Sequence, residues 1–196
     1  MHLRRMTCAV ICTMLAAPAI LYGQAGAAPA AAPATQSPGD SLNALMGILQ
    51  QEVVSAAEAM PADKYDFAPP ATMGEFKGVR TFAQQVKHLA QANYEFFQGW
   101  TVPGATAVDP KTIDALTTKD DIVKALKDSY TYAHAAIATI TPENAFIVMG
   151  KPPRTATRVF LASFCLAHSQ DHYGQMVEYL RMNGIVPPAS RQQGSM

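Results

Sequence analysis

The sequence predicts an all-α protein, a four-helix bundle with a long crossover loop between helices 1 and 2. Three observations support this fold class. Apolar residues recur at helical spacing in four stretches of about 20 to 28 residues each. Proline and glycine are frequent between these stretches, and no segment alternates strongly enough between apolar and polar residues to make a convincing strand. Long amphipathic helices joined by such loops are typical of a bundle.

Residues 1–27 have the layout of a secretory signal peptide. Two arginines precede an apolar run over residues 6–22, and small residues follow. Cleavage after Ala25 or Ala27 would leave small residues at the −3 and −1 positions. The alternative is a permanent membrane anchor, because the run approaches the roughly 18 residues that a span needs. Pro18 and the small residues favour cleavage.

Cleavage would export the protein to the periplasm or the cell exterior without a stable membrane span. Residues 28–39 then form a Pro/Ala-rich linker, residues 40–188 the helical domain and residues 189–196 a C-terminal tail. The whole chain of 196 residues carries no net charge, and loss of the two leader arginines leaves 13 basic and 15 acidic residues, a net charge of −2. Because phosphate binding needs a surplus of Lys and Arg, we expect no nucleic-acid partner.

The first helix is predicted over Ser41–Met60 and ends before Pro61. The segment that follows, Pro61–Arg80, is long for a bundle connection and carries Tyr65 and Phe67. We expect it to cross over and pack against one end of the bundle. Such a loop is compatible with a functional role and, equally, with a purely structural one.

Three further helices are predicted over Thr81–Trp100, Thr118–Ile140 and Thr155–Asn183. The second helix begins with Thr81 and Gln84, which form a capping-box pattern. Thr118 is the predicted N-cap of the third helix, and two aspartates follow near its positive end. Gly184 ends the last helix.

The last helix carries two histidines, His168 and His172. A spacing of four residues advances about 400° around a helix, so both rings lie on one face, one turn apart. Two buried neutral imidazoles without partners would be costly, and a shared divalent metal would satisfy both. Imidazole nitrogen suits zinc, nickel, copper and iron, of which we expect zinc or nickel. The alternative is a pair of core histidines bonded to carbonyls or hydroxyls.

A metal site in a bundle needs a further ligand from a facing helix. Spacing alone slightly favours His134 over His88, because His134 lies nearer the apolar stripe of its own helix. Glu95 and Glu52 are weaker candidates. Since no glutamate follows His168, the pair is not the HExxH pattern of a metalloprotease.

Cys165 is the only cysteine outside the leader, so an internal disulfide is excluded once the leader is removed. It lies one turn before His168 and is either a further metal ligand or a small core residue. Gln175, one turn beyond His172, is placed to line the open side of a metal, and Asp171 to hydrogen-bond a ligand ring. The alternative for Gln175 is simple packing, and the alternative for Asp171 is a solvated position on the helix surface.

Four blocks of sequence occur in a characteristic order: Asp63-Lys-Tyr-Asp-Phe-Ala-Pro, Arg80-Thr-Phe-Ala-Gln-Gln-Val-Lys-His-Leu-Ala-Gln-Ala-Asn, His168-Ser-Gln-Asp-His-Tyr-Gly-Gln and Tyr179-Leu-Arg-Met-Asn-Gly-Ile-Val-Pro-Pro. Together they resemble the DinB family, the damage-inducible DinB-like proteins of the DinB/YfiT superfamily of metalloenzymes. The likeness runs over roughly Ser41 to Pro188.

The resemblance implies a four-helix bundle with a long crossover, and a divalent metal held by His88, His168 and His172. On this reading His134, which spacing favoured, becomes a structural residue or a hydrogen-bond partner of a ligand. Three histidine ligands leave metal positions open to water or substrate, as in a catalytic site.

Some relatives are thiol transferases. The resemblance therefore implies a metal-dependent transferase or hydrolase with an unknown small-molecule substrate. The alternative is a metal-binding or stress-response bundle without catalysis. A homodimer formed through an exposed helix face is compatible with either function.

Overall fold

The structure, a computed structural model, describes residues 34–151 and 154–191. The predicted signal peptide and most of the predicted linker lie outside these residues. The described residues are mostly helical, which confirms the predicted predominance of helix. None of the helices in these two ranges is long and apolar enough to cross a membrane.

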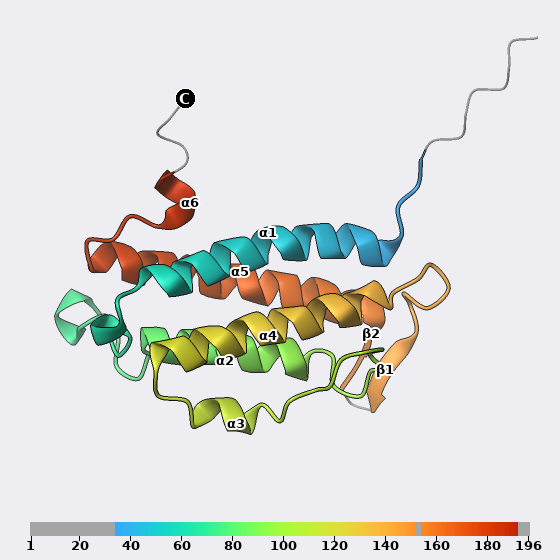
Figure 1. The fold of residues 1–196 in the computed structure, drawn as a ribbon, viewed down its shortest axis with the longest axis horizontal. Helices are drawn as coiled ribbons and strands as arrows, with labels where there is room; N and C mark the ends of the chain where they lie inside the picture. Colours follow the sequence, from blue (N-terminus) through green and yellow to red (C-terminus); the bar gives the residue numbers. More distant parts are fainter. Residues whose placement is uncertain (1–33, 152–153, 192–196) are drawn as a thin grey trace, which may run out of the picture. The chain divides into compact units, whose positions relative to one another are not determined.

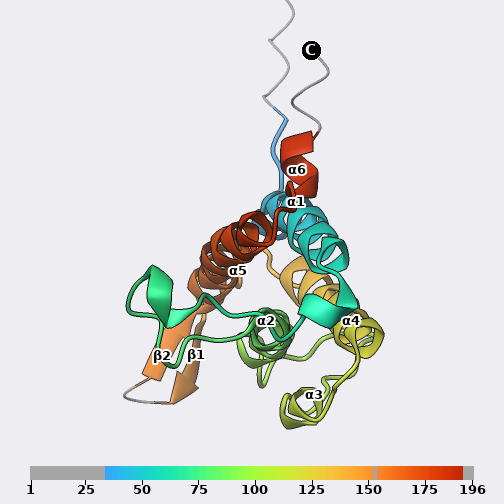
Figure 2. The ribbon, with the colours of Figure 1, turned by 90° about the vertical axis from the view of Figure 1, so that its left-hand side faces the viewer.

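Four long helices pack together: α1 (Pro38–Ala59), α2 (Phe82–Glu95), α4 (Lys119–Ala138) and α5 (Arg158–Met182). Both α1 and α2 contact α4 and α5. Seen end-on in Figure 2, α1 and α2 therefore stand on opposite sides of the arrangement, with α4 and α5 between them. The shorter helices are η1 (Ala62–Lys64), η2 (Ala71–Met73), α3 (Lys111–Asp114) and α6 (Pro188–Arg191).

Side chains cap the helices at their N-termini. Ser37 caps α1 by accepting a hydrogen bond from the Asp40 N–H, so this helix begins at Pro38 rather than at the predicted Ser41. The predicted capping box of α2 is present, because Thr81 accepts from the Gln84 N–H and Gln84 accepts from the Thr81 N–H. The predicted cap of α4 by Thr118 is also present.

Residues 148–157 form an antiparallel hairpin that the sequence did not predict. Strand β1 (Val148–Lys151) pairs with β2 (Arg154–Thr157), with Val148 opposite Thr157. Each strand has only four residues and β1 is largely exposed, so no alternating apolar pattern marks the hairpin. The prediction that the last helix begins at Thr155 is therefore wrong. Thr157 caps α5, which begins at Arg158.

α2 ends at Glu95 rather than at the predicted Trp100. The chain turns after α2 and passes through Gly99, whose positive φ of 79° is a conformation that favours glycine. Trp100 is buried beyond this turn, and its ring lies 4.0 Å from the guanidinium carbon of Arg158 at the start of α5. The turn therefore fixes the C-terminal end of α2 beside the hairpin and α5.

The segment 61–80 packs against α2 and α5, as its aromatic residues predicted. The Tyr65 ring lies edge-on to Phe82, with 5.3 Å between ring centroids. The Phe67 ring meets Tyr179 of α5 in the same way at 5.8 Å. In Figure 1 this segment and the β1–β2 hairpin lie at opposite ends of the long helices.

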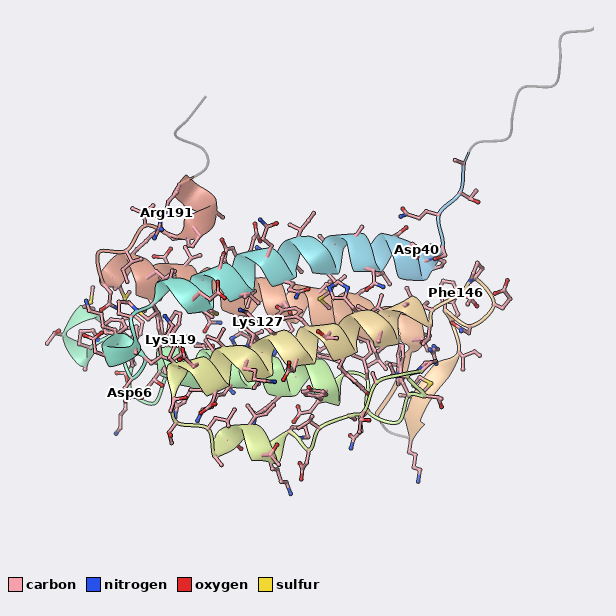
Figure 3. All side chains as sticks on the ribbon, viewed as in Figure 1. Asp40, Asp66, Lys119, Lys127, Phe146 and Arg191 are labelled. Carbon is pink, nitrogen blue, oxygen red and sulfur yellow. The ribbon has the colours of Figure 1, made fainter. Side chains whose placement is uncertain are left out.

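The core between the long helices is apolar. The largest fully buried side chains are Tyr130, Phe82, Phe97, Met46, Met60, Leu89, Ile122, Leu126, Ile137, Ile140, Met176 and Leu180. Lys127 of α4, labelled in Figure 3, also forms a 2.6 Å ion pair with Glu58 of α1, but both side chains are half exposed. Since exposed ion pairs contribute only about 0–1 kcal/mol, apolar packing holds these helices together.

Gly39, in the first turn of α1, lies against the end of α4. A Cβ atom there would stand 2.7 Å from the Ile140 carbonyl oxygen and 2.8 Å from that of Ile137. Gly39→Ala is therefore expected to lower the free energy of unfolding by about 1–3 kcal/mol, because the two helices must move apart.

The matched control is Gly47→Ala on the same helix, where a Cβ would meet nothing within 4 Å. It is expected to stabilise the protein by about 0.5–1 kcal/mol, through higher helix propensity. Denaturant unfolding measures both variants, and a stabilising effect of both would contradict the close approach at Gly39.

Candidate metal centre

Three histidines from two neighbouring helices form a cluster. His88 comes from α2, and His168 and His172 come from α5, which packs beside it. One ligand nitrogen from each ring lies within 4.8 Å of the other two. The ring centroids are 5.0 Å apart for His88 and His168, 4.8 Å for His88 and His172, and 4.5 Å for His168 and His172. The three ligands that the family resemblance implies therefore lie together.

The surroundings of the cluster keep the imidazoles neutral. Burial lowers the pKa of His88 to about 4, and the positive charges of Arg80 and His168 contribute. Burial, followed by the two neighbouring histidines, lowers the pKa of His172 to about 4. Burial also lowers the pKa of His168. At neutral pH each ring therefore keeps an unprotonated nitrogen, which is the form that binds a metal.

A chain of hydrogen bonds determines which nitrogen of His172 is free. The Asp171 carboxylate can only accept, so Gln175 donates to it through Nε2 at 3.0 Å. Gln175 Oε1 then accepts from Gln85 Nε2 at 2.7 Å, and Gln85 Oε1 accepts from His172 Nδ1 at 2.6 Å. His172 therefore carries its proton on Nδ1, and the lone pair of Nε2 is available for a metal.

The sequence did not identify Gln85 as the partner of His172. The available signal was its position three residues before His88, which places both side chains on one face of α2. Asp171 was expected to bond a ligand ring directly or to be solvated, but it reaches His172 through Gln175 and Gln85. Which glutamine would bridge these groups depends on how α2 lies against α5.

The donor set fits a metal ion. His168 Nε2 is buried and has no hydrogen-bond partner among the described residues, and such a group is costly unless something binds it. Zinc holds imidazole nitrogen at about 2.0–2.1 Å, so two ligands of one ion stand at most about 4.2 Å apart. The three nitrogens now lie within 4.8 Å of one another, so they would have to move closer together to share one ion.

His134, which spacing alone favoured as the third ligand, lies outside the cluster. Its Nδ1 is 2.9 Å from Asn43 Oδ1 and its Nε2 is 2.9 Å from Gln50 Oε1, so the ring joins α4 to α1. Of the two weaker candidates, neither Glu95 nor Glu52 belongs to the cluster.

Cys165 is also outside the cluster. Its thiol is buried and donates to Asn93 Oδ1 at 3.4 Å, and burial raises its pKa to about 12. A metal binds the thiolate form of cysteine, and the raised pKa keeps this thiol protonated. Cys165 is therefore a small core residue.

Two cavities open on either side of the histidines, and His88 lines both. The larger, about 1100 Å³, has a mixed polar and apolar lining that includes Arg80, Gln85 and Gln175. The smaller, about 630 Å³, is apolar, and His168 is part of its wall. A small molecule can therefore reach the histidine cluster from either side.

Comparisons with known proteins agree with this fold. A sequence model described as the DinB superfamily matches residues 47–176, a range that contains all three clustered histidines. Among solved structures, a DinB-like protein (YjoA) from Bacillus subtilis aligns with a TM-score of 0.54 and 19% sequence identity, covering 74% of this chain and 92% of that one. At this identity the likeness shows the fold alone. No curated protein sequence matches the chain.

The chain of hydrogen bonds predicts the effect of changing Gln85. Gln85→Leu keeps the size of the side chain but removes the acceptor that orients His172, so metal affinity should fall by about 10- to 100-fold. Gln85→Glu keeps an acceptor toward His172 Nδ1 and should retain most of the affinity. Calorimetric titration with zinc measures both variants. An equal loss of zinc affinity in Gln85→Leu and Gln85→Glu would contradict the role assigned to the Gln85 oxygen.

Proposed function

The chain belongs to the DinB superfamily, and from this premise we propose that it is a metal-dependent enzyme that binds one divalent ion through His88, His168 and His172. The observation that carries the proposal is the convergence of three neutral imidazoles, one of which has a buried nitrogen without a partner. An all-imidazole donor set suits zinc, nickel, copper and iron, and of these we propose zinc or nickel.

The chain's own residues would prepare this site for a ligand. The glutamine pair holds His172 in the tautomer that presents Nε2, and burial keeps all three rings unprotonated. When bound by three histidines, such an ion supplies a Lewis acid with open positions for water or substrate. The wall of the larger cavity beside His88 carries charges of both signs, Arg80 and Lys87 together with Asp114 and Glu178.

We propose a transferase or hydrolase reaction on a small molecule, with thiol transfer as the first reaction to screen. The two cavities beside His88 support a small-molecule substrate, since both are of a size that holds one. We also infer that the packing of the four long helices is a four-helix bundle in which the segment 61–80 acts as the crossover.

Purified protein should bind about one equivalent of zinc or nickel, as expected for a single three-histidine site. His88→Ala and His168→Ala should abolish stoichiometric binding. His134→Ala is the matched control, because it removes a part-buried histidine of α4 whose ring nitrogens lie 2.9 Å from side-chain oxygens of α1. Elemental analysis after native purification measures the metal content. Binding below about a tenth of an equivalent, or its retention in His88→Ala, would overturn the proposal.

We further propose that the protein is exported after cleavage of residues 1–27. The basic start, the apolar run and the small residues after it support this proposal. N-terminal sequencing of the mature protein should then begin at Gly26 or Ala28. Retention of Met1 would overturn cleavage.

A further inference from the structure

A row of aromatic rings leads from the surface to the histidine cluster. The ring centroids of Phe160 and Phe164 are 5.9 Å apart, those of Phe164 and Phe96 are 5.3 Å apart, and those of Phe96 and His168 are 5.6 Å apart. All four side chains line the apolar cavity. The cavity therefore runs along an aromatic wall that ends at a proposed metal ligand.

The aromatic wall is open to a ligand. Phe160 is 56% exposed and Phe164 is 51% exposed, although both are large apolar side chains on a long helix. Exposed apolar side chains gathered in a concave site are typical of a surface that a ligand covers.

The β1–β2 hairpin closes the other side of this cavity. Met149 and Gly150 of β1 and Thr155 and Ala156 of β2 line it, opposite the N-terminal half of α5. In Figure 2 the hairpin lies on the α2–α5 side of the arrangement, away from α1. The hairpin thus turns the exposed face of α5 into a cavity of about 630 Å³, which holds a ring-sized group.

Charge distinguishes the two sides of the cluster. Among the described side chains that line the apolar cavity, Glu95 is the one that carries a full charge. The larger cavity has Arg80, Lys87, Asp114 and Glu178 on its wall, so charges of both signs lie on that side. An uncharged apolar group is therefore favoured on the aromatic wall.

We propose that the substrate is a small molecule with a metal-binding head and an uncharged aromatic group, and that this group lies on Phe96, Phe160 and Phe164. This inference rests on the proposed metal site and adds the class of substrate. His88 and His168 line the same cavity as the three phenylalanines, so a head bound at the histidine cluster would leave the ring against the exposed phenylalanines. Phe160 and Phe164 are specificity residues for the ring, and neither holds the metal.

Two hydroxamates that share a metal-binding head test the proposal. Benzohydroxamate carries a ring and acetohydroxamate a methyl group, and calorimetry compares their binding to the zinc-loaded chain. Benzohydroxamate should bind at least about tenfold more tightly, since that ratio needs only part of the gain from burying a phenyl ring. Equal affinities would overturn the inference while leaving the metal site intact.

Substitutions of phenylalanine show which residues cause the preference for benzohydroxamate. Phe160→Ala/Phe164→Ala should remove the advantage of benzohydroxamate, while zinc stoichiometry and acetohydroxamate affinity stay the same. Both residues are half exposed, so the double variant should remain folded. Phe146→Ala is the matched control: Figure 3 labels this phenylalanine in the loop that follows α4, and it is 76% exposed and outside the cavity.

These measurements distinguish failure of the proposed metal site from failure of the proposed ring position. A loss of the ring preference in Phe146→Ala, or its retention in the double variant, would overturn the assigned position of the ring. Failure of the chain to bind zinc would overturn the proposed function, and with it the metal-binding head.

Discussion

The packing of α2 against α5 is the constraint on which the site depends. It brings His88 to the two histidines that α5 places one turn apart. It also allows Gln85 to bond His172 and Gln175 at once, so a single interface positions one ligand and orients another. Both cavities border this interface, because His88 lines each of them.

The position of α2 along α5 is set at its N-terminal end. The N–H groups of Phe82 and Ala83 donate to the carbonyls of Phe67 and Tyr65, and the Tyr179 hydroxyl of α5 donates to the Arg80 carbonyl at 3.0 Å. These bonds tie the segment 61–80 to the start of α2 and to α5. Since a shift of one residue along a helix moves a side chain by about 1.5 Å and turns it by about 100°, such ties are needed to keep His88 level with its partners.

Several local rules of protein structure are broken close together. Three neutral imidazoles crowd one another, a buried nitrogen of His168 lacks a partner, and two phenylalanines stand half exposed on a long helix. Isolated breaks occur elsewhere too, because Trp100 Nε1 is buried without a partner among the described residues and Ile48 of α1 is exposed, but the helix caps follow the usual pattern. Breaks of this kind concentrate at functional sites, where the missing partner is the ligand. At this site a metal and an aromatic ligand would supply the missing contacts.

The sequence by itself determined the four long helices, the caps at Thr81 and Thr118, and the shared face of His168 and His172, because these depend on residues a few positions apart. The family likeness then pointed to His88. Spacing alone slightly favoured His134, and it did not reveal the hairpin, the exposure of Phe164 or the bridge through Gln85. Periodicity defines the faces of one helix, but it does not say how neighbouring helices are rotated and offset. Only the tertiary packing decided those, and with them which histidine, which glutamine and which phenylalanines meet at the site.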